Sequence, residues 1–179
     1  MGIHFTVTVD HTFRDTSLDA VRNRFKPLQP ILDELSDKSL PEHSMWRDVS
    51  EPGSTRPYLF YTPGGFTLQM GPAVMRLHHF TRFSTFIEAA ALRDLLRRFS
   101  KQLAQLFGQH RALYAPCEGI GDEIVDWLAD GLSLADIETR LRLRSSPPAT
   151  IAELAGRSLP ELRYYIDEFE DCYIATAGS

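Results

Sequence analysis

The sequence predicts a single α+β domain over residues 1–179, in which a mostly antiparallel sheet carries helices packed on one face. Two observations predict this class. Apolar and polar residues alternate along an N-terminal strand and along a three-strand meander over residues 58–80, and a stretch with helical spacing follows over residues 86–107. Period-two alternation is typical of half-buried strands, whereas apolar residues three and four positions apart are typical of an amphipathic helix.

The first predicted element is a strand that begins at Ile3. Its apolar residues alternate with polar ones, which gives the strand one face for the core and one for water. We expect it to join the central sheet, with a pairing partner that the local pattern does not specify. His4 lies on the polar face of this strand, where we expect it to be solvated.

A helical segment is predicted over residues 16–35. Thr16 and Asp19 have the spacing of a capping box, and apolar residues follow them at helical spacing. Pro27 and Pro30 lie inside this pattern, and an interior proline costs a helix about 3 kcal/mol. We therefore expect a kink or two short helices, packed on the sheet.

Residues 37–56 are polar and rich in turn-forming residues, so we expect a long surface loop there. Trp46 is the largest apolar residue of this segment. Two interpretations of it stay open. Trp46 either fixes the loop to the body of the protein, which we favour, or serves as an exposed anchor for a partner.

Pairing inside the meander follows from two glycine-containing turns. A two-residue turn at Gly71-Pro72 places Leu68 opposite Met75, and a second at Gly64-Gly65 places Tyr61 opposite Leu68. These pairs gather apolar side chains on one face of three strands. An antiparallel meander with one covered face is the expected result.

The long helix that should cover this face is predicted to begin at Thr85, which has capping-box spacing to Glu88. Gly108 follows its last apolar residue, as a left-handed helix end would require. Three more elements are predicted: a strand over 111–115 and helices over 118–128 and 134–143. Residues 162–173 fit either a helix or a strand.

Composition indicates a folded protein with a net charge of −5 that is unevenly spread. Residues 1–116 hold fourteen Lys and Arg against eleven Asp and Glu, whereas residues 117–179 hold five against thirteen. Such asymmetry is typical either of an interaction surface or of two halves that neutralise each other, and we favour the second.

The chain contains no apolar run near the roughly 20 residues that a membrane span needs. It also lacks a basic and apolar signal segment. We therefore expect a cytoplasmic protein that makes no membrane contact. Cys117 and Cys172 are too few for a disulfide framework and lack zinc-site spacing, so we expect free thiols.

His78 and His79 are adjacent, so on a strand they point to opposite faces, His79 to the apolar face and His78 to the polar one. They cannot share one metal ion from the same strand. No HExxH or similar pattern supplies further ligands, so we assign no metal ligand and no cofactor. His78 joins Arg76 on the polar sheet face. This face is either an ordinary one, solvated or covered by other helices, which we favour, or a surface that binds an anion or a partner.

Cys117 is the weak candidate for a catalytic residue. It precedes a predicted helix, and thiols at helix starts are often reactive. His78, His79 or His110 would be the base in a Cys-His hydrolase. Against this, acidic residues surround Cys117 and disfavour a thiolate, and no local nucleophile motif is present.

The residues between Arg76 and Pro116 include seven basic and two acidic side chains. A nucleic-acid-binding module would use such a basic helix, here residues 86–107. The overall acidity of the chain and the lack of a nucleic-acid motif disfavour that interpretation. The tail has the opposite character, because aromatic and acidic residues alternate there.

Together these patterns favour a small non-catalytic binding protein of the immunity or inhibitor type, which presents an acidic and aromatic surface to a basic protein partner. The oligomeric state is left open. The competing interpretation is that the acidic tail docks on the basic helix of its own chain. The residues assigned to binding are Trp46, Arg76, His78, Tyr164, Tyr165, Asp167, Glu168, Phe169, Glu170 and Asp171.

Overall fold

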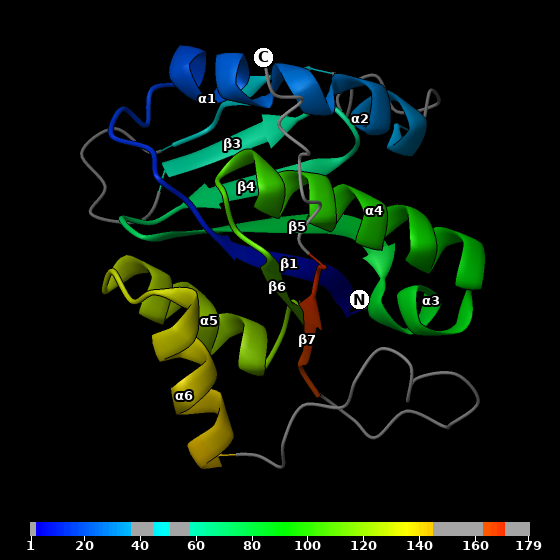
Figure 1. Ribbon diagram of the computed structural model, residues 1–179, viewed down its shortest axis with the longest axis vertical. Helices are drawn as coiled ribbons and strands as arrows, with labels where there is room; N and C mark the ends of the chain where they lie inside the picture. Colours follow the sequence, from blue (N-terminus) through cyan, green and yellow to red (C-terminus); the bar gives the residue numbers. More distant parts are fainter. Residues whose placement is uncertain (1–2, 37–44, 51–57, 145–162, 171–179) are drawn as a thin grey trace, which may run out of the picture.

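A computed structural model describes residues 3–36, 45–50, 58–144 and 163–170 of the chain. Within these residues seven strands form one sheet in the order β2-β3-β4-β5-β1-β6-β7, and each neighbouring pair is antiparallel (Figure 1). The α+β class and the mostly antiparallel sheet are confirmed. The strands are β1 (His4–Asp10), β2 (Arg47–Asp48), β3 (Tyr58–Thr62), β4 (Phe66–Met70), β5 (Val74–Arg82), β6 (Arg111–Pro116) and β7 (Tyr165–Glu168).

The helical segments lie between these strands along the chain. Most of them are short, and α4 is the longest that the structure describes, at 17 residues. Among the described residues, no helix combines the length and the apolar character that crossing a membrane requires. The helical segments are α1 (Leu18–Phe25), η1 (Lys26–Leu28), α2 (Gln29–Leu35), α3 (Phe83–Glu88), α4 (Ala90–Leu106), α5 (Ile120–Ala129) and α6 (Leu134–Arg144).

One face of the sheet carries the larger hydrophobic core. Phe5, Val7 and Val9 of β1 point into it and are fully buried. They meet residues of α1 to α4, such as Phe99, in one continuous cluster. The alternation that predicted β1 therefore places its apolar residues inside, and β1 occupies the middle of the sheet between β5 and β6.

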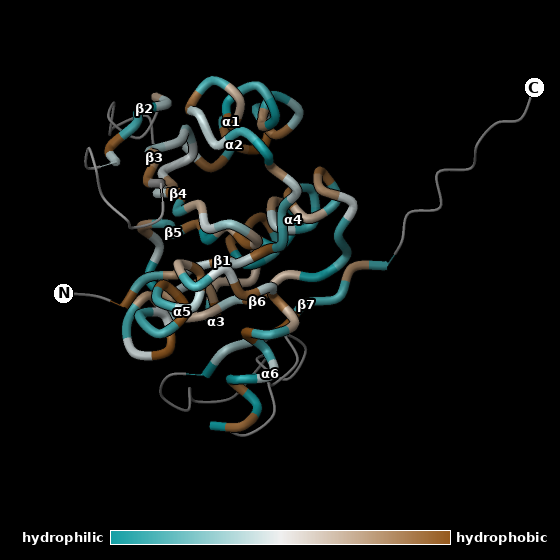
Figure 2. Tube along the Cα trace, turned by 90° about the vertical axis from the view of Figure 1, so that its left-hand side faces the viewer, coloured by the Kyte–Doolittle hydropathy of each residue, from teal (hydrophilic) through white to brown (hydrophobic). Residues whose placement is uncertain are grey.

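The opposite face is covered at the β6 end by α5 and α6, a layer that the sequence analysis did not anticipate. Residues of β6 alternate between two cores: Tyr114 belongs to the larger cluster, whereas Leu113 and Ala115 belong to a second one with Trp127 and Ile137. Figure 2 shows α4 and α5 on opposite sides of β1 and β6. Both faces of β6 are therefore buried.

The turn between β4 and β5 is centred on different residues from those expected. Leu68 pairs with Leu77 rather than with Met75, which pairs with Met70. The Gly71 N–H donates to the Val74 carbonyl at 2.9 Å, so that Pro72 and Ala73 are the central residues of the turn. Proline suits the first central position because its φ is already fixed. The shift moves the partners by two residues and preserves the predicted faces, so all these apolar residues are buried.

The turn between β3 and β4 corrects the expected face of β3. Three residues, 63–65, separate the strands, and both glycines among them have positive φ. Leu68 therefore pairs with Phe60 and not with Tyr61. One extra loop residue turns the strand over: Phe60 is fully buried and Tyr61 is 39 % exposed.

Two predicted helix starts are also wrong by a few residues. Ser17, not Thr16, caps α1, because its side chain accepts the Ala20 N–H. The predicted long helix is two helices, α3 from Phe83 and α4 from Ala90, separated by the extended backbone of Ala89. Neither has a side-chain cap, so the predicted Thr85 start is wrong. The expected break near the prolines and the end at Gly108, with φ of 69°, are confirmed.

Candidate functional site

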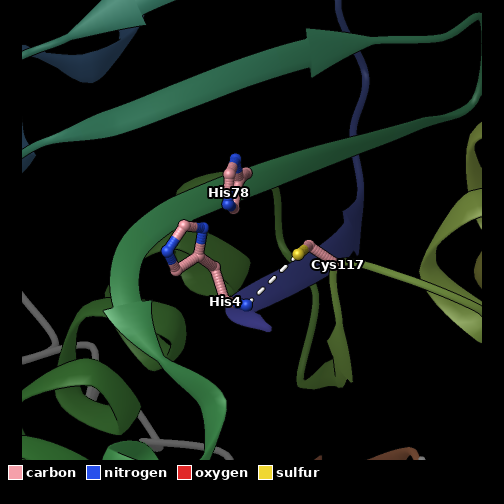
Figure 3. A group of neighbouring side chains, drawn as sticks. All are labelled: His4, His78 and Cys117. Carbon is pink, nitrogen blue, oxygen red and sulfur yellow. Dashed lines mark hydrogen bonds between the residues drawn. The ribbon is translucent and has the colours of Figure 1, made fainter. Parts of the chain in front are cut away.

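Three side chains with metal-binding or nucleophilic atoms converge on the polar face of the sheet. His4 is the first residue of β1, His78 lies in β5 and Cys117 follows the end of β6. Because β1 lies between β5 and β6, residues far apart in the sequence become neighbours here. Figure 3 shows the two imidazole rings and the thiol pointing toward one another from these three strands.

The contacts within this cluster are short. One ligand atom of each residue (an imidazole nitrogen of His4 and of His78, and Sγ of Cys117) lies within 4.8 Å of the other two. The ring centroids of His4 and His78 are 5.1 Å apart with a tilt of 34°. The backbone N–H of His4 donates to Cys117 Sγ at 3.1 Å, and the Cys117 N–H donates to the His4 carbonyl at 2.9 Å. The second bond extends the β1–β6 ladder by one residue, and the first holds the sulfur beside His4.

His78 is held in its neutral form at physiological pH. Burial is the main cause that lowers its pKa to about 4, and repulsion from Arg76 and His4 lowers it further. Its Nε2 atom is buried and has no hydrogen-bond partner among the described residues. A neutral imidazole with a free ring nitrogen is suited to bind a metal ion or to accept a proton.

Arg76 lies next to the cluster, two residues before His78 on the same face of β5. It is 4 % exposed. Its Nη1 donates to Gln69 Oε1 at 2.7 Å and its Nη2 donates to the Cys117 carbonyl at 3.3 Å. Burial lowers the pKa of Arg76 to about 10, partly opposed by Cys117 and Asp122, so the guanidinium stays charged at neutral pH.

The start of α5 closes one side of the cluster at Gly121. A Cβ atom at this position would lie 2.2 Å from the Pro116 carbonyl oxygen and 3.0 Å from Arg76 Nη2. Only glycine lets the helix approach the end of β6 so closely. Asp122 accepts the Gly119 N–H at 3.0 Å, which fixes the turn between Cys117 and the helix.

The site residues predicted in the tail lie mostly inside the protein. Tyr164, Tyr165, Asp167 and Phe169 are buried, whereas Glu168 and Glu170 are exposed, and Asp171 lies outside the described residues. The strand interpretation of this segment is correct, because Tyr165–Glu168 forms β7 beside β6.

The acidic tail docks on the basic helix of its own chain. Arg97 binds both carboxylate oxygens of Asp167, at 2.8 Å through Nε and 3.1 Å through Nη2. The hydroxyl of Tyr114 donates to the same carboxylate at 3.1 Å. Burial, together with the charge of Asp167, raises the pKa of Tyr114 well above its ordinary value, so the hydroxyl keeps its proton. Arg98 of the same helix pairs with Glu34.

Of the remaining candidates, Trp46 packs against the edge of the core. Its ring lies 5.4 Å from that of Phe25 in an edge-to-face arrangement, and its side chain is partly buried. This contact favours the interpretation that Trp46 fixes its segment to the body of the protein. Residues 37–44 and 51–56 of the predicted loop, and Cys172, lie outside the described residues.

His78 was expected beside Arg76 and as one possible base for Cys117, but the part of His4 and the convergence of two imidazoles with the thiol were missed. We expected His4 to be solvated, but it is partly buried against His78. The argument that His78 and His79 cannot share a metal ion remains valid, because His79 points into the core and is 1 % exposed. Knowledge that β1 pairs with both β5 and β6 was the missing signal.

Comparisons with known proteins assign this chain to no family. No family model matches the chain, and no curated protein or solved structure gives a match. The functional proposal therefore rests on the cluster of His4, His78 and Cys117.

Proposed function

We propose that this protein binds a divalent transition-metal ion, with Zn²⁺ as the first candidate, through His4, His78 and Cys117. The observation that carries the proposal is the convergence of two imidazoles and one thiol within 4.8 Å, from three different strands. Imidazole and thiolate are the ligands that Zn²⁺ prefers in proteins. Neither the spacing of residues along the sequence nor the alternation within one strand predicts that these three ligands lie together.

The geometry needs only a small adjustment to hold the ion. Bonds of about 2.0–2.3 Å in a tetrahedral arrangement place ligand atoms roughly 3.5 Å apart. The three side chains therefore have to close by about 1 Å, which small rotations about their χ angles supply. The neutral state of His78 favours binding, since no proton has to leave that ring at neutral pH.

Three protein ligands leave one position of a tetrahedral ion open. Structural zinc sites have four protein ligands, whereas catalytic sites keep one position for water or substrate. All three residues are partly exposed, so solvent reaches the cluster. A reactive or ligand-binding site is therefore favoured over a purely structural one. A cytoplasmic location belongs to this proposal, because reducing conditions keep Cys117 a free thiol.

Metal titration of the full chain tests the proposal. The wild type should bind one Zn²⁺, and Co²⁺ in its place should give a thiolate-to-metal charge-transfer band. Cys117→Ser and His78→Gln should each weaken binding at least tenfold, and Cys117→Ser should remove the band. His110→Gln, which changes an exposed histidine, is the matched control. Equal affinity in the wild type and Cys117→Ser would refute the assignment.

A thiol hydrolase is the second candidate, because the same geometry places an imidazole near Cys117 Sγ. The neutral ring of His78 would serve as the general base. The two functions differ in their response to a chelator. A metal-free protein whose Cys117 reacts rapidly with a thiol probe, and which hydrolyses ester substrates, would support the hydrolase. Slow labelling that Zn²⁺ suppresses would support the metal site.

The hypothesis of an immunity-type binding protein ranks below these two. Most of the aromatic side chains assigned to its surface are buried, and Asp167 is paired with Arg97. Exposed Glu168 and Glu170 would have to carry the contact with a basic partner. A pull-down in which Glu168→Lys releases a basic protein would favour it. The nucleic-acid alternative is weaker still, since Arg97 and Arg98 of the basic helix already pair with carboxylates.

A further inference from the structure

The charge of Arg76 lacks an ion-pair partner among the described residues. Its two hydrogen bonds go to neutral acceptors, Gln69 Oε1 and the Cys117 carbonyl. A guanidinium has five N–H donors, so three remain, and Nε is buried without a partner. Asp122 attracts Arg76 from a distance but bonds to the Gly119 N–H. A buried, unpaired charge is costly, which calls for an anion nearby.

Orphaned polar atoms gather around this guanidinium. Thr8 pairs with Arg76 across β1 and β5, and its buried hydroxyl has no partner in the part of the chain that the structure describes. His78 Nε2, two residues along β5, is a third such atom. Buried polar atoms nearly always have hydrogen-bond partners. His78 Nε2 is available to the metal ion, so the two remaining orphans, Arg76 Nε and Thr8 Oγ1 on one sheet face, indicate a group that they share.

Binding of a metal ion sharpens this imbalance. A dication on His4, His78 and Cys117 receives one negative charge from the thiolate. Arg76 adds a further positive charge, and its Nη2 lies 3.3 Å from the carbonyl oxygen of a ligand residue. Counting the dication, the thiolate, Arg76 and Asp122, the carboxylate that attracts Arg76, these four groups sum to +1. An anion at the open position of the metal would neutralise that charge.

From these observations, and resting on the proposed metal site, we infer that the site takes an oxyanion, the carboxylate or phosphate group of a small ligand. One oxygen fills the open position of the metal ion, and another accepts hydrogen bonds from the Arg76 guanidinium. The planar guanidinium matches carboxylate and phosphate geometry. The ligand class of the protein is therefore an anionic small molecule.

Anion titration of the Co²⁺-loaded full chain tests this inference, with inorganic phosphate and acetate as the probes. The visible bands of Co²⁺ report its coordination, so an anion that enters the open position shifts them. We expect a saturable shift in the wild type with at least one of the two probes. The probe that binds more tightly distinguishes a phosphate ligand from a carboxylate ligand.

Two variants test the part that Arg76 plays. Gln69→Glu places a carboxylate where the Arg76 Nη1 bond now ends, which pairs the charge within the protein. Arg76→Lys keeps the charge and loses the planar fork. Gln69→Glu should weaken anion binding at least tenfold and Arg76→Lys at least fivefold, each measured on protein saturated with Co²⁺. Gln69→Glu adds an ion pair, so it should fold even if Arg76→Lys does not.

Each outcome has one meaning. A wild type that binds Co²⁺ but shows no shift with either anion overturns the inference and leaves the metal site standing. An equal shift in the wild type and Gln69→Glu overturns it as well, because the anion then binds without Arg76. Failure to bind Co²⁺ at all overturns both proposals. A saturable shift that Gln69→Glu weakens supports the oxyanion site.

Discussion

Lowering the pH below 6.5 should destabilise the metal-free protein through His78. Its pKa of about 4 in the folded chain lies below the ordinary value of 6.5, chiefly because of burial. Between these values the unfolded chain binds a proton that the folded chain does not, so stability falls as the pH falls. Above pH 6.5 the ring is neutral in both states, and the contribution is fully present.

The size of this effect follows from the same two values. Proton linkage between a pKa of 6.5 and one of about 4 gives a loss of about 2 kcal/mol at pH 5. Because His78 is partly exposed, solvent screening reduces the expected loss to about 1 kcal/mol. Such a loss is a substantial part of the stability of a domain of this size.

Urea unfolding at pH 7 and pH 5 in the presence of a chelator measures it. The wild type, His78→Gln and the exposed-site control His110→Gln are compared, so that contributions common to all three cancel. His11, whose pKa is also lowered by burial, is among these. The wild type and the control should lose about 1 kcal/mol more than His78→Gln. Equal losses in all three proteins would refute the reasoning.

Three further substitutions test the packing around the site and the sheet. Gly121→Ala should cost about 1–3 kcal/mol, since its Cβ would lie 2.2 Å from the Pro116 carbonyl oxygen; an unchanged melting temperature would contradict this close approach. Phe60→Ala should cost about 3–5 kcal/mol, whereas Tyr61→Ala should cost less than about 1 kcal/mol; the reverse order in urea unfolding would contradict the register of β3. Asp167→Asn should cost about 2 kcal/mol, because an arginine and a buried tyrosine lose a charged acceptor; a smaller loss than that of Glu170→Gln would count against the docked tail.

Local patterns predicted most of the elements, because each depends on residues close together in the chain. The alternation in β1 is strict, and Leu68 and Leu77 lie on the faces that were expected. Turn length was the weak point. Gly64 and Gly65 both favour positive φ, yet glycines alone do not tell a two-residue loop from a three-residue one. That single residue decided whether Phe60 or Tyr61 entered the core.

Local sequence patterns could not predict the candidate site, for a different reason. His4 and Cys117 are 113 residues apart, and their contact depends on which strands become neighbours in the sheet. Nothing near His4 specifies that β1 inserts between β5 and β6. Metal-ligand motifs are recognised in a sequence by fixed spacings within one element. Ligands from three separate strands leave no such spacing to find.

The central position of β1 also has a consequence for how the chain folds. This strand precedes its partners β5 and β6 by some 70 and 110 residues, so it leaves the ribosome before either of them. Contacts of such long range are slow to form because their loops must close first. His4, His78 and Cys117 can meet only after both hydrogen-bonded ladders exist. A metal ion bound by these residues would therefore stabilise contacts that form late in folding. It would slow unfolding far more than it speeds folding.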